Sequence, residues 1–509
     1  MINVFTVLKR KLSHVCSLKP YKETKWLMPN GNPIGMYVYN CIADQKVPVI
    51  LNDPKIATWY SCGPTVYDSA HIGHACCYVK LDILQRVLKS FFNIKLVTAM
   101  GITDIDDKII KKANETDSDF RVIAKNYEHE FWRDLTSLNV EKPMIITRVS
   151  DHIHTIQDFV KNLVDTNMAY ITNDGSVYFD TSKFPSYGKL QNMQDCGEPI
   201  TIEKRNKMDF ALWKGCKPGE PFWETSWGKG RPGWHIECSA MVSKVFGSQI
   251  DFHAGGIDLQ FPHHENEEAQ SCAYHDTRQW ANYWIHVGHL NFKDIKMSKS
   301  LQNTVSITDL LQTYTADTFR MACLMSNYRY PMEYSDEMMK TAEAVLNKFK
   351  FFLKDVFTYV NNSKNGHGDY SNKLLEELQK AEENNLEALK KDFDTASCVN
   401  SLLSLVSCAN KIIKGNTKDY YPVPVVLTAQ YIINVLTKFG LKLQETSENT
   451  ISNSLIDTLV EFRHIVRKTA MLRKDKELLN ACDTVRDKMK MMKVQINDSN
   501  NTPTWVMTK

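Results

Sequence analysis

A strand, a helix and a second strand follow one another near the start of the chain, and this order constrains the fold most. The apolar run 56–62 ends in the turn Gly63-Pro64. A helical pattern opens at His71, and a second apolar run covers residues 94–100. Parallel strands need a crossover connection of this kind, which is usually a helix. The sequence therefore predicts an α/β fold with a parallel sheet.

A chain of 509 residues is too long for one hydrophobic core, so its length predicts several domains. Short strands and turns between residues 122 and 229 indicate an insertion in the sheet, and apolar residues at helical spacing follow Tyr334. The expected order is a flexible N-terminus, a parallel-sheet domain, a helical bundle and a C-terminal region, at residues 1–34, 35–334, 335–450 and 451–509.

The N-terminus is basic and contains no acidic residue before Glu23. Lys9, Arg10 and Lys11 stand among Val, Leu and Phe residues, a composition typical of a mitochondrial presequence. The alternative is a basic tail on a cytosolic enzyme. We therefore expect the mitochondrial matrix, with the cytoplasm as the alternative.

Composition excludes few classes of protein. The net charge is +3, and nucleic-acid binding needs a local basic face rather than a basic total. The 13 cysteines are scattered through a long chain, which indicates reduced thiols rather than a disulfide framework. No run of about 18 apolar residues is evident, so no membrane-spanning segment is expected.

His71-Ile72-Gly73-His74 stands where the first helix begins. A helix N-terminus offers unpaired N–H groups and a partial positive charge, which suit a phosphate. Gly73 lets a flat base approach the backbone, and the imidazoles of His71 and His74 can donate to a phosphate as charge develops. On its own the tetrapeptide is weak evidence, because histidines near a helix start are usually structural.

Lys296-Met297-Ser298-Lys299-Ser300 lies far downstream in a polar stretch. Two lysines separated by small residues can reach the β- and γ-phosphates of a nucleotide and stabilise a leaving pyrophosphate. A solvated lysine loop is the alternative interpretation.

Cys62, Cys238, His263 and Glu267 are candidates for one metal site. His263 and Glu267 are four residues apart, so they share a face if the segment is helical. Two thiolates, an imidazole and a carboxylate suit Zn²⁺. Two alternatives remain open: both cysteines are simply small buried residues, or His264 replaces His263 as the ligand.

These segments resemble known proteins when taken together. The tetrapeptide at His71 and the Lys296 segment resemble the paired motifs of class I aminoacyl-tRNA synthetases. Several further segments are similar to the cysteinyl-tRNA synthetase family, and the resemblance extends from Gly35 to Trp505. They are Tyr60-Ser61-Cys62-Gly63-Pro64-Thr65-Val66-Tyr67, Thr103-Asp104-Ile105-Asp106-Asp107-Lys108, Gly233-Trp234-His235-Ile236-Glu237-Cys238 and Phe261-Pro262-His263-His264-Glu265-Asn266-Glu267.

The resemblance implies a Rossmann-like catalytic domain that binds ATP with Mg²⁺ and joins L-cysteine to tRNA(Cys). It implies one zinc ion per chain, held by the four candidates above, and a monomeric enzyme. It also assigns roles by position. His71, His74, Lys296 and Lys299 are catalytic; Gly73 and Asp258 bind ATP, with Asp258 at the ribose; Gly63, Thr103, Trp234 and His253 form the cysteine pocket.

A metal in the amino-acid pocket has a physical reason. A free thiol has a pKa near about 8.5, and coordination to zinc deprotonates it, whereas a serine hydroxyl keeps its proton. Thiolate is also the softer ligand that zinc prefers. We expect discrimination at the binding step and no editing activity.

The C-terminal region, from Ala481 to Trp505, resembles the anticodon-binding part of the family. The tetrapeptide that contains Lys108 and Lys111 matches a family segment linked to pyridoxal-phosphate-dependent formation of cysteine persulfide. The same four residue types recur at 411–414, where no role is assigned.

Two other functions stay open at this point. One is the related ligase that joins cysteine to an amino sugar, which lacks an anticodon-binding region such as residues 335–509. The other is a non-catalytic tRNA-binding relative, which would have damaged motifs, whereas His71, His74, Lys296 and Lys299 are all in place.

Overall fold

A computed structural model describes residues 26–191, 204–292, 295–296, 304–361, 372–415, 422–443, 450–498 and 503–508. The basic N-terminal segment and Lys299 lie outside these residues. An antiparallel hairpin comes first, with β1 at Asn32–Asn40 and β2 at Gln45–Leu51.

The centre of the molecule is a five-stranded parallel sheet in the order β12-β11-β3-β4-β5. Its strands are buried, since Trp59 and Tyr60 of β3 are inaccessible to solvent and every residue of β12 is buried. Helix α2 crosses over between β3 and β4, which confirms the predicted strand–helix–strand unit. The bounds are Ile56–Thr65 for β3, Ile72–Ser90 for α2, Lys95–Thr103 for β4, Ile145–Arg148 for β5, Ile250–Gly256 for β11 and Ala281–Val287 for β12.

Between β5 and β11 the chain forms a second, antiparallel sheet in the order β6-β7-β8-β10-β9. We expected an insertion from residue 122, yet β5 pairs with β4 in the parallel sheet. Four residues are too few to give a strand pattern, which explains the difference. The elements are α3 Asp107–Glu115, α4 Phe120–Ser137, α5 Ile153–Asp165, β6 Ala169–Ile171, β7 Val177–Phe179, β8 Phe210–Gly215, β9 Trp223–Thr225, β10 Gly228–Pro232, α6 Trp234–Phe246 and α7 Glu265–His275.

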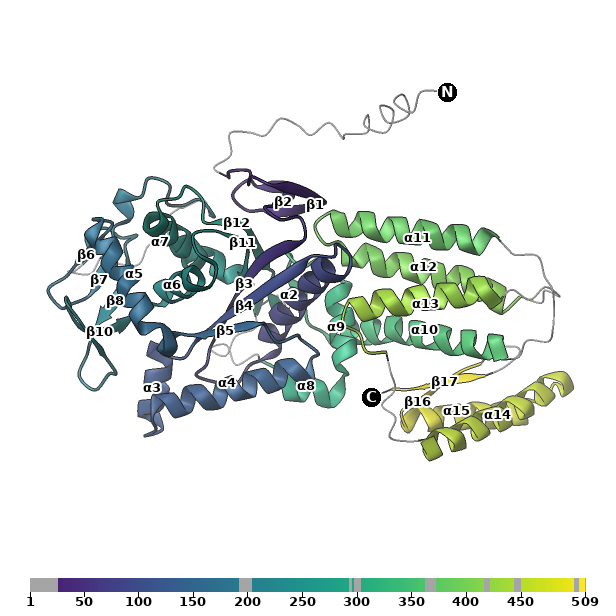
Figure 1. Cartoon of the computed structure of the whole chain (residues 1–509). Coiled ribbons are helices and arrows are strands. Elements are labelled where there is room, and N and C mark those ends of the chain that lie inside the picture. Colours follow the sequence, from purple (N-terminus) through teal and green to yellow (C-terminus); the bar gives the residue numbers. More distant parts are fainter. Residues whose placement is uncertain are drawn as a thin grey trace, which may run out of the picture.

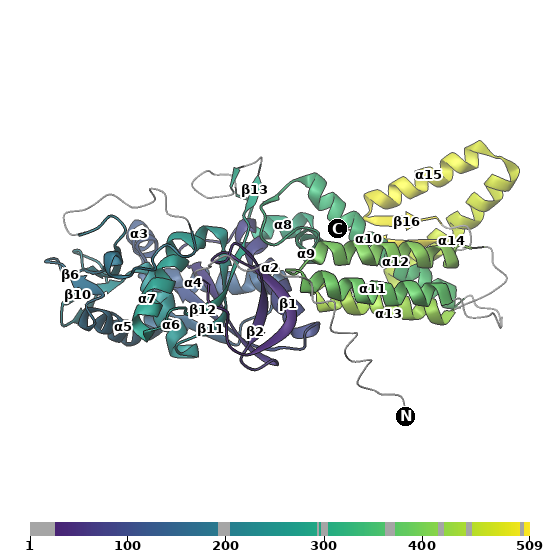
Figure 2. The ribbon, with the colours of Figure 1, turned by 90° about the horizontal axis from the view of Figure 1, so that it is seen from above.

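Helices fill the second half of the chain, as expected, and lie on the side of the parallel sheet opposite the antiparallel sheet (Figure 1). Helices α10 to α13 run side by side, and the α14–α15 pair packs with a small hairpin beside them (Figure 2). The bounds are α8 Ile307–Thr313, α9 Ala316–Leu324, α10 Asp336–Asn361, α11 Asn372–Lys390, α12 Thr395–Ile413, α13 Pro422–Lys438, α14 Thr450–Arg473, α15 Lys476–Met491, β16 Val494–Asn497 and β17 Thr504–Met507; short strands β13 Leu290–Phe292, β14 Ile295–Lys296 and β15 Met332–Glu333 precede them.

One helix in the described part of the chain, α12, is long and apolar enough to cross a membrane by length and composition alone. The core helix of a soluble protein passes the same test. Helix α12 packs against α10, α11 and α13, which accounts for its apolar residues.

The side chain of Arg320 joins three parts of the molecule. Arg320 is fully buried on α9, and its guanidinium contacts Asp82 on α2 at 2.5 Å. It also donates to the carbonyl of Asn139, which follows α4, at 2.8 Å and to that of Phe439, which follows α13, at 3.2 Å. A buried charge is stable only when it is paired and hydrogen-bonded, so this network fixes α2 against the helical bundle.

Replacing Arg320 by Met is expected to lower the free energy of unfolding by about 3–5 kcal/mol, because Asp82 and the carbonyls of Leu138, Asn139 and Phe439 lose a buried donor. Urea unfolding followed by tryptophan fluorescence measures the change. Arg121→Met is the control, since its side chain is 74% exposed and the loss there is expected to stay within about 0.5 kcal/mol. Equal stability of the two variants would contradict the role given to Arg320.

Candidate functional site

A cavity of about 580 Å³ lies at the carboxyl ends of β3, β4 and β11, where open parallel sheets bind their ligands. Strand ends, the first turn of α2 and the first turn of α6 form its walls. Its lining includes Cys62, Gly63, Thr103, Lys108, Trp234, Cys238, Asp258 and His263, together with His71, Gly73 and His74. Most of the predicted site residues therefore meet in one cavity.

His71 and His74 open helix α2 as a reciprocal cap. The Nδ1 atom of His71 accepts from the backbone N–H of Gly73 at 3.1 Å, and the Nδ1 atom of His74 accepts from the N–H of His71 at 3.2 Å. In a neutral imidazole the proton is then on Nε2 of both rings, which makes Nε2 the donor. A Cβ atom at Gly73 would come within 2.8 Å of the His71 ring, so glycine keeps this arrangement open.

Cys62, Cys238, His263 and Glu267 bring four candidate ligand atoms within 4.8 Å of one another. The two sulfurs are 3.9 Å apart, the Cys62 sulfur is 3.6 Å from Glu267 Oε1, and His263 Nε2 is 3.0 Å from the same oxygen. Tetrahedral zinc with bonds of roughly 2.0–2.3 Å spaces its ligands by about 3.3–3.8 Å. The group is thus able to hold a metal ion of that size.

All four side chains are buried, and their charges depend on one another. The hydrogen bond from Cys62 lowers the pKa of Cys238 to about 6, against the opposing effect of burial. Burial raises the pKa of Cys62. Burial also opposes ionisation of Glu267, but His253 and His263 lower its pKa to about 2. Against the effect of burial, Glu267 and Cys238 raise the pKa of His263 to about 10. The imidazole of His263 is therefore the positive partner of these acids, and a bound cation would take over that charge.

His264 and His253 lie behind these four residues. His264 Nε2 is 3.4 Å from the Cys62 sulfur, and Cys62, His253 and His264 form a second group close enough to hold an ion. His253 does not line the cavity as expected for a pocket residue. It is fully buried and contacts Glu267 Oε2 at 2.9 Å, so it orients that carboxylate.

The other predicted pocket residues lie on the cavity wall. Trp234 stacks on the His263 ring with centroids 4.4 Å apart and remains partly exposed. A Cβ atom at Gly63 would come within 2.0 Å of the Gly101 carbonyl, so only glycine fits there. Thr103 donates to the buried carboxyl of Glu237 at 3.0 Å. Glu237 was not singled out from the sequence, although it directly precedes Cys238.

Of the four lysines predicted for the site, the structure places one in the cavity. Lys108 lines the cavity near the Tyr67 ring, whereas Lys111 is exposed and pairs with Glu115 at 3.8 Å. Lys296 is described only as backbone of β14, and Lys299 lies outside the described residues.

The C-terminal helices contain many basic residues, but not all of them face solvent. Arg463 on α14 is buried, pairs with Asp498 at 2.5 Å and donates to the Cys482 carbonyl, so it holds the C-terminal helices together.

Comparison with known proteins agrees with this geometry. Residues 49–344 match the family described as tRNA synthetases class I (C) catalytic domain. The probable mitochondrial cysteine–tRNA ligase of Xenopus tropicalis is 38% identical, with 94% of this chain and 91% of the relative covered. The cytoplasmic cysteine–tRNA ligase of Dictyostelium discoideum is 36% identical over 95% of this chain and 79% of the relative.

A solved structure of Mycobacterium tuberculosis methionyl-tRNA synthetase is similar in fold, with a TM-score of 0.57 and 15% identity over 80% of this chain and 94% of that chain. This likeness supports the predicted α/β architecture. The chain belongs to the cysteine–tRNA ligase family of class I tRNA synthetases.

Proposed function

We propose that this protein activates L-cysteine with ATP to give cysteinyl-adenylate and pyrophosphate, and then transfers cysteine to tRNA(Cys). One observation carries the proposal. Two thiols, an imidazole and a carboxylate meet within 4.8 Å, and three of them, those of Cys62, Cys238 and His263, line the same cavity as the α2 histidines. A thiol-selective group and a phosphate-binding helix start are therefore adjacent.

The residues around the cavity would divide the work in the first step. The N-terminus of α2 and the Nε2–H groups of His71 and His74 would stabilise charge on the phosphates of ATP, which enters with Mg²⁺. Lys296 and Lys299 would neutralise the leaving pyrophosphate. Asp258, which lines the cavity beyond β11, would accept from the ribose. The protein's contribution is position and charge rather than a covalent intermediate.

The four ligand-type residues would hold one Zn²⁺ per chain, which fits a set of two sulfurs, one nitrogen and one oxygen. When bound, zinc supplies a soft Lewis acid that takes a thiolate in preference to a hydroxyl. Trp234 and Thr103 would enclose the rest of the amino acid, and Glu237 would fix the Thr103 hydroxyl through its 3.0 Å hydrogen bond. No separate editing site is required by this scheme.

The proposal also covers the cellular compartment, the oligomeric state and a second reaction of this protein. The acid-free N-terminal composition and the likeness to a mitochondrial relative favour the mitochondrial matrix, with the cytoplasm as the alternative. The working state would be a monomer. Lys108 lines the catalytic cavity and would form the Schiff base with pyridoxal phosphate for persulfide formation, whereas Lys111 is exposed and pairs with Glu115.

The overall reaction is tested in two stages with the purified full chain. Cysteine-dependent exchange of pyrophosphate into ATP is expected, with serine at least about 100-fold poorer, and it separates an enzyme from a non-catalytic tRNA-binding relative. Charging of tRNA(Cys) then separates this ligase from one that uses an amino sugar. Exchange without tRNA charging would refute the proposed acceptor.

Cys238→Ser is expected to lower bound zinc from about one equivalent per chain to below about 0.2, because a hydroxyl is a poor zinc ligand. Elemental analysis of the purified protein measures this directly. Cys272→Ser is the control, since Cys272 is equally buried but lies outside the four-residue group. Full zinc content in Cys238→Ser would exclude the proposed ligand set.

His74→Ala is expected to reduce the exchange rate by about 10²–10³-fold, the typical cost of removing one donor to developing charge. Binding of cysteine, measured by calorimetry, should change less than about threefold, because His74 lies at the phosphate end. A rate within fivefold of the wild type would contradict the role of the α2 start.

A further inference from the structure

A second cavity, of about 640 Å³, lies beside the catalytic one and shares no lining residue with it. The turn that follows β11 separates the two. Gly256, Asp258 and Leu259 line the catalytic cavity, whereas Ile257 and Gln260 line the second one. The cavities are therefore neighbours on opposite sides of one thin wall, and nothing in the first step uses the second.

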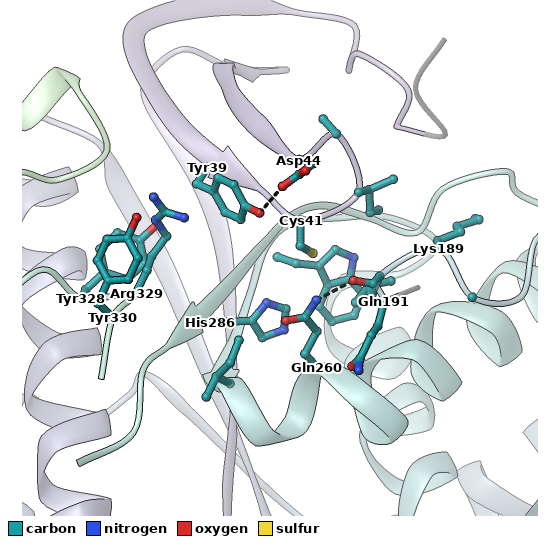
Figure 3. A pocket seen from close by; sticks show the side chains of 16 residues that line it. Tyr39, Cys41, Asp44, Lys189, Gln191, Gln260, His286, Tyr328, Arg329 and Tyr330 are labelled. Atoms are coloured by element: carbon teal, nitrogen blue, oxygen red, sulfur yellow. Dashed lines mark hydrogen bonds between the residues drawn. The ribbon is translucent and has the colours of Figure 1, made fainter. Parts of the chain in front are cut away.

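One side of the second cavity presents a fixed cation between aromatic rings. The guanidinium carbon of Arg329 lies 4.0 Å from the centre of the Tyr39 ring and 5.3 Å from that of Tyr330. The guanidinium of Arg329 also forms an ion pair with Asp392 at 3.0 Å, which holds it in place. Figure 3 shows Tyr328, Arg329 and Tyr330 together on this side, with Tyr39 and Cys41 above the centre.

The floor and the far side offer flat rings and amide groups. Trp284 and His286, next-but-one neighbours on β12, have rings inclined by only 3° to each other. Trp284 is 1% exposed, and its indole N–H has no hydrogen-bond partner among the described residues. Lys189, Gln191 and Gln260 stand opposite Arg329 (Figure 3). Because Trp284 is buried, it forms the base of the cavity, and Tyr330 presents an exposed ring on the cavity wall.

Two imidazoles connect this floor to the candidate metal group. His286 Nε2 lies 2.9 Å from His264 Nδ1, and His264 Nε2 lies 3.4 Å from the Cys62 sulfur. Only the side chains of His286 and His264 would therefore separate a ligand at His286 from Cys62 of the candidate metal group.

We propose that the second cavity binds one unpaired nucleotide, with its base against the exposed ring of Tyr330 and its phosphate at Arg329. Aromatic faces and guanidinium planes are what proteins use to hold unstacked bases, and arginine is the preferred partner of phosphate. The volume suits a ligand of this size. The nucleotide comes either from the single-stranded end of tRNA, which rests on the proposed function, or from a free mononucleotide.

Two variants close or strip this cavity without touching the catalytic one. Ala43→Trp places an indole into it, since Ala43 lines its rim. Tyr330→Ser removes a ring that is 59% exposed and therefore contributes little to the core. Met144→Trp is the matched control, because Met144 is 72% exposed and lines neither cavity.

Three probes are measured by calorimetry with the full chain: CMP in the presence of saturating ATP, tRNA(Cys), and the same tRNA lacking its unpaired 3′ nucleotides. The expected result is a loss of affinity of about 10-fold or more in Ala43→Trp and Tyr330→Ser, relative to Met144→Trp, with cysteine-dependent exchange within twofold of the wild type. A loss for complete tRNA but not for the truncated one identifies the tRNA end. A loss for CMP alone identifies a free nucleotide.

Unchanged affinity for all three probes would overturn the proposal, and so would an equal loss for complete and truncated tRNA. A wild-type protein that binds no CMP and binds both tRNAs equally would overturn it as well. The proposed function is tested separately, because it fails if the wild type lacks cysteine-dependent exchange or does not charge tRNA(Cys).

Discussion

The meeting of Cys62, Cys238, His263 and Glu267 is the constraint around which the catalytic half of the molecule is arranged. The four residues come from the end of β3, the first turn of α6, and the turn and helix that follow β11. Each is buried, and each would be costly there alone, since a thiolate or carboxylate without a partner is unstable in a protein interior. A shared cation would offset that cost, and it would also coordinate the sulfur of the substrate.

The surrounding residues maintain this arrangement. His253 fixes Glu267 from behind, Trp234 covers His263 from the cavity side, and Gly63 lets β3 approach β4 closely enough to place Cys62. Arg320 then fixes α2, which begins at the same cavity, against α4 and the helical bundle. Direct contacts therefore connect the amino-acid site, the phosphate site and the helical bundle. Catalysis by positioning needs reacting groups that are held in place in this way.

Local pattern predicted the parts that depend on neighbouring residues. The strand–helix–strand unit, the start of α2 at His71 and the helices after Tyr334 all follow from short-range periodicity and end signals. The choice of metal candidates came from residue types and family resemblance, because no spacing in the sequence brings Cys62 near Cys238. Strand β5 was missed, since four residues give no period. The burial of Arg463 could not be predicted, because a charged residue carries no sign of a distant partner such as Asp498. The second cavity could not be predicted, since its walls come from residues as far apart as Tyr39 and Tyr330.

X-ray absorption at the zinc edge tests the central claim most directly. With the purified full chain, we expect a first shell of two sulfur and two nitrogen or oxygen neighbours. The shell should gain a third sulfur when cysteine is added and stay unchanged when serine is added. A shell without sulfur, or one that cysteine leaves unaltered, would contradict the idea that the metal group recognises the substrate thiol.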